Sequence, residues 1–215
     1  MVKAVLFDLD GTLADTAPDL GYALNCLRLA HGLAKLPLEQ IRPQASNGAR
    51  GLLKLGFDLD TDNPSFPNMR QTFLNLYEEN LCRETTLFPG IPELLTHLEV
   101  CALPWGIVTN KPSRFTLPLL KQLGLDARAA CIISGDTCAH PKPHPAPLLA
   151  GCEAIAIAPQ HCVYVGDDLR DVQAGQAAGT RTIVATYGYL GSSAHPLSWG
   201  ADGVIDHPQD LIAYL

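Results

Sequence analysis

Short apolar runs alternate with helix-like segments along most of this chain, and this alternation determines the class of fold. Brief runs rich in β-branched residues predict strands, and the amphipathic segments between them predict helices. The predicted strands are Ala4–Phe7, Trp105–Val108, Cys131–Ile133, Cys162–Val165, Thr182–Ala185 and Gly203–Ile205, and the predicted helices are Ser113–Leu123, Ala146–Ile155, Asp168–Ala178 and Pro208–Leu215. Because such an alternation is typical of a parallel sheet with helices on both faces, we predict an α/β fold.

One long stretch interrupts the alternation. From Asp15 to Leu87 the sequence contains no strand-like run, and helical segments are predicted near Pro18–His31, Leu38–Leu55 and Ser65–Cys82. Roughly 70 residues are too many for an ordinary connection between strands. We therefore predict a helical cap at residues 15–87, inserted after the first strand into a Rossmann-like core of residues 1–14 and 88–215.

The composition narrows the classes of function. Of the 215 residues, 47% are hydrophobic and 17% are charged, which is typical of a soluble globular protein. The net charge of −7 disfavours nucleic-acid binding, and no apolar run is long enough to cross a membrane. Seven cysteines without a C-x-x-C pattern indicate a reducing compartment. We expect a cytoplasmic protein, a monomer or homodimer, that binds neither nucleic acid nor membrane.

The tetrapeptide FDLD occurs twice, at residues 7–10 and 57–60. The second copy follows a predicted helix that ends at Gly56, and its acidic alternation resembles the start of a calcium loop. That loop requires Gly at its sixth position and Glu at its twelfth, where this chain has Asn63 and Met69. The second copy is therefore interpreted as a solvated acidic turn within the cap.

The first copy stands where the first predicted strand ends. In an open parallel sheet, ligands bind beyond the carboxyl ends of the strands, so Asp8 and Asp10 are expected to face that crevice. Gly11 then permits a tight turn, and Thr12 offers a hydroxyl group. A D-x-D pattern alone is weak support for an active site, so the prediction depends on which residues follow the other strands.

Three further strand ends carry polar side chains of a matching kind. A hydroxyl and an amide able to hold a phosphate follow the second strand, a lysine between two prolines follows the third, and an acidic cluster follows the fourth: Thr109, Asn110, Lys142, Asp167, Asp168 and Asp171. Each has an ordinary alternative, since Thr109-Asn110 could cap a helix, Lys142 could be a surface lysine, and Asp168 is best explained as a helix cap. Their joint occurrence at successive strand ends favours one shared active site.

These motifs resemble the haloacid dehalogenase superfamily, in its phosphatase branch. Asp8-Leu9-Asp10-Gly11-Thr12 matches the family pattern D-x-D-G-T, Thr109 the second motif, Lys142 the third, and Gly166-Asp167 with Asp171 the fourth. Among subfamilies the chain looks like the phosphoglycolate phosphatase group. The stretches SNGAR, VTNKPSRF, GTRTIVATYGY and WGADGVIDHP resemble bacterial N-acetylmuramic acid 6-phosphate phosphatases.

The resemblance implies a magnesium-dependent phosphatase that works through an aspartyl-phosphate intermediate. Asp8 would be the nucleophile, and Mg²⁺ would be held by Asp8, the backbone carbonyl of Asp10, and Asp167. A carboxylate that approaches a phosphate is repelled by roughly 4 kcal/mol per pair of unit charges at 4 Å, so neutralisation of this repulsion by cations such as Mg²⁺ is a precondition for attack. Lys142 would add a third positive charge. Asp171, one layer further from the phosphate, would hold Lys142 or a metal-bound water.

The remaining roles concern proton transfer and substrate recognition. Asp10 would protonate the leaving oxygen and then activate water, while Thr109 and Asn110 would hold phosphate oxygens. Substrate readers in the cap are expected at Asn47, Gly48 and Arg50, with Arg42 as a further candidate. Lys111 and Arg114, just past the second motif, could serve the same purpose. The resemblance implies that the substrate is a small phosphate ester, either phosphoglycolate or a sugar phosphate such as N-acetylmuramate 6-phosphate.

Two other functions remain open from the sequence. A phosphosugar mutase of the same superfamily would return the phosphate to its substrate, and assays of free phosphate against isomerised sugar phosphate separate the two. A phospho-accepting signalling module also combines acidic residues, a Thr and a Lys around Mg²⁺. Such modules are much shorter and have no helical insertion, which disfavours this alternative.

Overall fold

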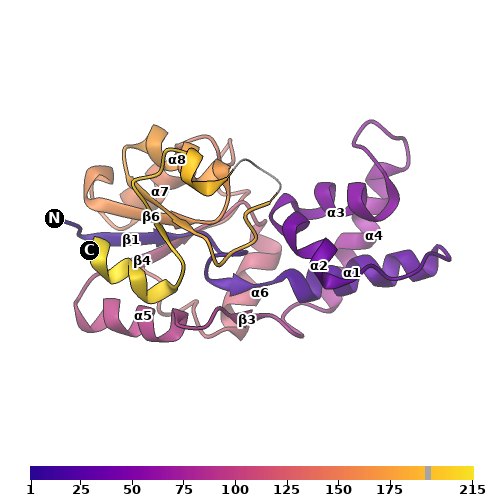
Figure 1. The fold of residues 1–215 in the computed structure, drawn as a ribbon, viewed down its shortest axis with the longest axis horizontal. Helices are drawn as coiled ribbons and strands as arrows, with labels where there is room; N and C mark the ends of the chain where they lie inside the picture. Colours follow the sequence, from indigo (N-terminus) through magenta and orange to yellow (C-terminus); the bar gives the residue numbers. More distant parts are fainter. Residues whose placement is uncertain (192–194) are drawn as a thin grey trace.

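A six-stranded parallel sheet forms the centre of the molecule's larger part (Figure 1). The computed structural model describes residues 1–191 and 195–215. The strand order is β5-β4-β1-β6-β7-β8, with bounds β1 (Ala4–Phe7), β4 (Trp105–Val108), β5 (Ile132–Ile133), β6 (Cys162–Gly166), β7 (Arg181–Ala185) and β8 (Gly203–Ile205). The predicted α/β fold is confirmed, and the six predicted strands lie within one residue of their predicted ends.

Helices cover both faces of this sheet, which explains why its strands are apolar along their length. All four residues of β1 are buried. Val5 and Phe7 share an apolar core with α5 and α6, whereas Ala4 and Leu6 share one with α7 and α8. The helices are α5 (Ile91–Val100), α6 (Ser113–Gln122), α7 (Ala146–Ala154) and α8 (Leu169–Ala178), and a 3₁₀ helix spans Pro208–Tyr214. Among the described residues, no helix has the length and apolar character needed to cross a membrane.

The helical segments within residues 17–79 lie together at one end of the molecule, and both chain termini lie near the other end (Figure 1). They are α1 (Ala17–Ala30), α2 (Leu38–Ile41), the 3₁₀ helix Arg42–Asn47, α3 (Gly48–Phe57) and α4 (Phe66–Glu79). The chain enters and leaves this region through an antiparallel pair, β2 (Ala14–Asp15) with β3 (Thr86–Leu87). We propose that residues 15–87 form a cap joined to the core at this pair.

Three features of the chain differ from the sequence prediction. The single helix predicted at Leu38–Leu55 is wrong, because Pro43 lies within a 3₁₀ turn and Gly48 has a φ of 57°. The positive φ of Gly48, which favours glycine, interrupts the helical conformation between the 3₁₀ helix and α3. The helix α5 and the pair of two-residue strands β2 and β3 were not predicted.

The second FDLD follows the end of α3. The helix extends one residue beyond the predicted Gly56, and Asp58 adopts the left-handed conformation with φ 51°. Asp58 and Asp60 are exposed, and their carboxylates lie 2.6 and 2.7 Å from the ammonium of Lys54. This copy is thus a solvated acidic turn paired with a lysine.

Candidate active site

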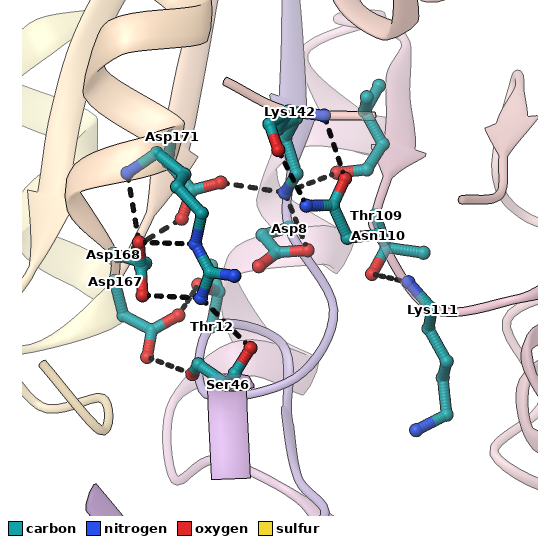
Figure 2. A network of polar contacts seen from close by, with 12 residues as sticks. Asp8, Thr12, Ser46, Thr109, Asn110, Lys111, Lys142, Asp167, Asp168 and Asp171 are labelled. Atoms are coloured by element: carbon teal, nitrogen blue, oxygen red, sulfur yellow. Dashed lines mark hydrogen bonds and ion pairs between the residues drawn. The ribbon is translucent and has the colours of Figure 1, made fainter. Parts of the chain in front are cut away.

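The polar side chains predicted at the strand ends meet at the carboxyl edge of the sheet (Figure 2). From β1 the chain proceeds to β4 and β5 on one side, and then to β6, β7 and β8 on the other. The order therefore reverses at β1, and in open α/β sheets ligands bind at this reversal point. Asp8 follows β1, Thr109 follows β4 and Asp167 follows β6, so these three residues lie at the reversal point.

The loop after β1 is shaped by Gly11. Its φ is 84°, and a Cβ atom added there would lie 2.2 Å from Oδ2 of Asp167. Only glycine tolerates both the backbone conformation and this close approach. The hydroxyl of Thr12 donates a 3.0 Å hydrogen bond to Oδ1 of Asp167. The glycine and threonine of the D-x-D-G-T pattern thus join the β1 loop to the β6 carboxylate.

Lys142 is the cation at the centre of the site. Its Nζ lies 3.0 Å from Oδ1 of Asp8 and 2.7 Å from Oδ1 of Asp171, and the side chain is almost entirely buried. Nζ also lies 2.7 Å from the hydroxyl of Tyr164. Burial alone would lower the pKa of Lys142, but Asp171 and Asp8 outweigh it and hold the pKa above its ordinary value. The ammonium therefore stays charged beside Asp8.

Asn110 holds the lysine loop in place. Its amide nitrogen donates to the backbone carbonyl of Lys142 at 2.9 Å, and its amide oxygen accepts from the backbone N–H of Lys142 at 2.9 Å. Because both ends of the amide are engaged, Asn110 holds the backbone of Lys142 in position. Its role as a phosphate ligand stays a prediction. Thr109 accepts a 3.2 Å hydrogen bond from the N–H of Lys111, which leaves its own O–H as a donor.

The buried carboxylates oppose one another electrostatically. Burial, partly offset by Lys142, raises the pKa of Asp8 to about 6, and the charges of Asp171 and Asp10 add to the rise. Burial and the neighbouring Asp8 and Asp171 raise the pKa of Asp167 well above its ordinary range. Folding thus holds several carboxylates together at a free-energy cost, which is characteristic of functional sites.

A divalent cation would relieve this repulsion, and the donor set suits one. Oxygen atoms of Asp8, Asp167 and Asp171 lie within 4.8 Å of one another. Asp171 is engaged elsewhere, because its Oδ1 contacts Lys142 and its Oδ2 accepts from the N–H of Asp168. Among the described residues, none donates a hydrogen bond of good geometry to Oδ1 of Asp8, although Nζ of Lys142 lies 3.0 Å away. Carboxylate and carbonyl oxygens are the ligands that Mg²⁺ prefers, so Asp8 and Asp167 fit this ion.

Asp10 is held from two sides. Oδ1 accepts hydrogen bonds from the hydroxyl of Thr16 at 2.5 Å and from Nζ of Lys111 at 2.9 Å. Lys111 is buried, and its Nζ lies 4.7 Å from the ring centre of Tyr77 on α4. The ammonium predicted to read the substrate instead pairs with Asp10.

A cavity of about 310 Å³ lies between the sheet edge and the cap. Asp8, Asp10, Thr109 and Lys142 line it from the core, and Asn47, Gly48 and Arg50 line it from the cap. Two predicted candidates are placed elsewhere: Arg42 pairs with Asp15 at 2.7 Å, and Arg114 stacks on Phe115 with 4.3 Å to the ring centre. Among the described residues, neither of these arginines lines the cavity.

Cap and core touch directly at the acidic cluster. Arg170 pairs with Asp168 at 2.7 Å and donates a 2.9 Å hydrogen bond to the carbonyl of Ser46. The hydroxyl of Ser46 lies 3.5 Å from Oδ2 of Asp167. Asp168 accepts a hydrogen bond from the N–H of Arg170 and caps α8, which confirms its predicted role.

Several residues of the site were not predicted. They are Thr16, Ser46, Arg70, Tyr77, Tyr164, Arg170 and Tyr189. Ser46 stands within the quoted SNGAR stretch, Arg170 between Asp168 and Asp171 of the predicted acidic cluster, and Tyr189 within the quoted GTRTIVATYGY stretch, so a signal existed for these three. The N–H of Tyr189 donates a 2.9 Å hydrogen bond to Oδ2 of Asp167, which only the folded chain reveals.

Comparisons with known proteins agree with this arrangement. A family model described as haloacid dehalogenase-like hydrolase matches residues 5–185. The chain is 42% identical to an N-acetylmuramic acid 6-phosphate phosphatase of Pseudomonas aeruginosa, covering 100% of this chain and 95% of that protein. It is 43% identical to a phosphoglycolate phosphatase of Xanthomonas campestris pv. campestris, covering 97% and 94%.

Solved structures show the same architecture. The structure described as a predicted phosphoglycolate phosphatase from Haemophilus somnus 129PT superposes with a TM-score of 0.87 at 28% identity, covering 99% of this chain and 97% of that one. CbbY from Rhodobacter sphaeroides, solved in complex with phosphate, superposes with a TM-score of 0.77 at 23% identity and covers 98% and 96%. Because the identity to CbbY is only 23%, this similarity supports the shared fold alone.

Proposed function

Because the chain belongs to the haloacid dehalogenase-like hydrolase family and is a phosphatase, we propose that it hydrolyses N-acetylmuramate 6-phosphate or a sugar phosphate of similar size. The reaction would use Mg²⁺ and form a covalent phosphoaspartate at Asp8. The observation that carries the proposal is the ion pair of Lys142 with Asp8 at 3.0 Å, beside Asp167 at the reversal point of the sheet.

In the first step a carboxylate oxygen of Asp8 bonds to phosphorus, and the bond from phosphorus to the sugar oxygen breaks. Asp10 gives its proton to that leaving oxygen. Its carboxylate is held for this task by Thr16 and Lys111. Acid–base help of this kind accelerates reactions by about 10²–10⁴.

In the second step Asp10 takes a proton from water, whose oxygen attacks the phosphorus and releases Asp8 and inorganic phosphate. Lys142 keeps a positive charge beside Asp8 through both steps, and the O–H of Thr109 is available to a phosphoryl oxygen. Mg²⁺, when bound by Asp8, Asp167 and the carbonyl of Asp10, would supply two further positive charges that offset the repulsion between carboxylate and phosphate.

The cavity favours a sugar phosphate over a two-carbon acid. Its volume of about 310 Å³ is at the lower end of the range for drug-sized ligands, about 300–1,000 Å³. Much of its lining is apolar and comes from Leu20, Ala45, Phe73, Leu74 and Phe115. Phosphoglycolate would leave most of these side chains uncovered. It remains the second candidate because relatives of 43% identity carry that name.

A panel of phosphate esters assayed for released phosphate with Mg²⁺ tests the proposal. We expect the highest kcat/KM for N-acetylmuramate 6-phosphate and a hydroxylamine-sensitive phosphoprotein during turnover. Asp8→Asn should abolish both, whereas Asp58→Asn, at the same place in the second FDLD, should change neither. Near-normal activity of Asp8→Asn would exclude the proposed nucleophile, and sugar-phosphate isomerisation without free phosphate would indicate the mutase.

A further inference from the structure

We propose that Arg70 on α4 binds a carboxylate of the substrate and makes the enzyme selective for phosphate esters that carry a second anionic group. The inference rests on the proposed function and concerns the cap end of the same cavity. Arg70 is exposed and lines this cavity together with Arg50 of α3.

One face of α4 forms the cap wall of the cavity. Arg70, Phe73, Leu74 and Tyr77 all line it, and their spacing of three, four and seven residues places them on one side of the helix. Phe73, Leu74 and Tyr77 are buried, and Arg70 is the charged member of the row. Because this row of side chains ends at the exposed Arg70, it places a positive charge at the rim of the cavity.

Tyr77 and Arg70 mark two different depths of the cavity. Tyr77 lies against Lys111, which contacts Asp10, so this end of the row is beside the reacting groups. Seven residues separate Arg70 from Tyr77, which corresponds to about 10 Å along a helix axis. Both side chains lean towards the helix N-terminus, so the offset between their backbone positions is carried over to the side chains.

The pairing of charges in the cavity shows which Lys and Arg side chains are available to bind a ligand. Lys142, Lys111 and Arg170 each pair with a carboxylate of the site. Within the described residues, Arg50 and Arg70 have neither an ion pair nor a side-chain hydrogen bond. A substrate with a second negative charge would therefore meet two guanidinium groups at the rim that have no carboxylate partner in the described part of the chain. Guanidinium groups are well suited to carboxylates because they bind both oxygens at once.

The distance selects between the two candidate substrates. In phosphoglycolate three bonds separate phosphorus from the carboxyl carbon, a span of about 4 Å, whereas eight bonds separate them in N-acetylmuramate 6-phosphate, a span of up to about 10 Å. Only the longer molecule would place its phosphate at Asp8 and its carboxylate at the rim formed by Arg70. The chemical class that fits is a sugar phosphate with an acidic substituent remote from the phosphate.

A pair of substrates that differ only in that substituent tests the inference. N-acetylglucosamine 6-phosphate lacks the lactyl carboxylate of N-acetylmuramate 6-phosphate. For Arg70→Gln we expect kcat/KM on the acidic sugar to fall about 10- to 100-fold, mainly through KM, as expected for a lost charged hydrogen bond. On the neutral sugar it should stay within about twofold, and Arg70→Lys should retain part of the preference.

The matched control is Arg83→Gln, also in the cap. Arg83 stacks on Tyr22 with 4.2 Å to the ring centre, and among the described residues it is not part of the cavity lining. This variant should keep the wild-type preference. Equal losses of Arg70→Gln on both sugars, or no loss on the acidic one, would overturn the inference and leave the phosphatase assignment intact. Absence of all phosphatase activity in the wild type would refute both.

Discussion

Replacing the proposed nucleophile should stabilise the metal-free protein while it abolishes activity. In the folded chain the pKa of Asp8 is about 6, against 3.8 for an ordinary aspartate. Because the folded state holds this proton more tightly than the unfolded state, protonation of Asp8 stabilises the fold relative to the ionised form. This stabilisation is complete below about pH 4 and is lost as the pH rises through 6. The difference of about two pH units corresponds to roughly 3 kcal/mol.

Asparagine resembles the protonated carboxyl group, so Asp8→Asn should remove this penalty. At pH 7.5 without divalent metal we expect the variant to be more stable by up to about 3 kcal/mol. For a protein of this size that corresponds to a rise in Tm of roughly 6–12 °C. At pH 4 the two proteins should melt within a few degrees of each other, because Asp8 is then largely protonated in the wild type.

Thermal unfolding followed by circular dichroism in EDTA, at pH 4 and pH 7.5, measures this difference. Asp58→Asn is the control, and as an exposed substitution it should change stability by no more than about 0.5 kcal/mol. Added Mg²⁺ should raise the Tm of the wild type more than that of Asp8→Asn, because a ligand stabilises the state that binds it. If Asp8→Asn melts no higher than the wild type at pH 7.5, or if the gap is equal at both pH values, the electrostatic argument is wrong.

Three further outcomes follow from the same contacts. Lys142→Met should lower kcat by at least about 10²–10³, measured by phosphate release, since it removes the cation 3.0 Å from Asp8; a smaller loss would contradict its role. Asp10→Asn should slow formation of the phosphoenzyme and slow its hydrolysis further, measured by rapid quench, and unchanged hydrolysis would rule out Asp10 as the base. Gly11→Ala should destabilise the fold by about 1–3 kcal/mol in chemical denaturation, because its Cβ would lie 2.2 Å from Asp167; wild-type stability would show that the loop can relax.

The strands could be predicted closely because burial on both faces makes them continuous apolar runs. Both Val5 and Leu6 are buried although they point to opposite faces, so no polar residue obscures the ends of β1. The helix α5 was missed although Ile91, Leu94, Leu95 and Leu98 repeat at helical spacing. Prolines and a glycine around its start resemble a loop. The two-residue strands β2 and β3 have no local pattern, because their pairing joins segments far apart in the sequence.

The core of the site was predictable for a similar reason. Asp8, Thr109 and Asp167 stand at ends of strands whose order places them together. Contacts between cap and core were not predictable, because Arg170 and Ser46 are separated by more than a hundred residues and share no local signal. The partner of Lys111 was likewise missed, since the sequence places it beside Thr109 and says nothing of Asp10.

The two FDLD copies show why identical tetrapeptides could not locate the proposed nucleophile. Asp8 and Asp58 occupy the same position in the tetrapeptide, and each has a lysine ammonium within 3.0 Å. The pKa of Asp58 is lowered, chiefly by its hydrogen bond to Lys54, because solvent surrounds the carboxylate and burial adds little. The pKa of Asp8 is raised although the ammonium of Lys142 lies only 3.0 Å away, because burial outweighs the ion pair and other carboxylates share the site. A lysine partner is therefore common to both aspartates, and burial among other carboxylates is what separates the proposed nucleophile Asp8 from the solvated Asp58.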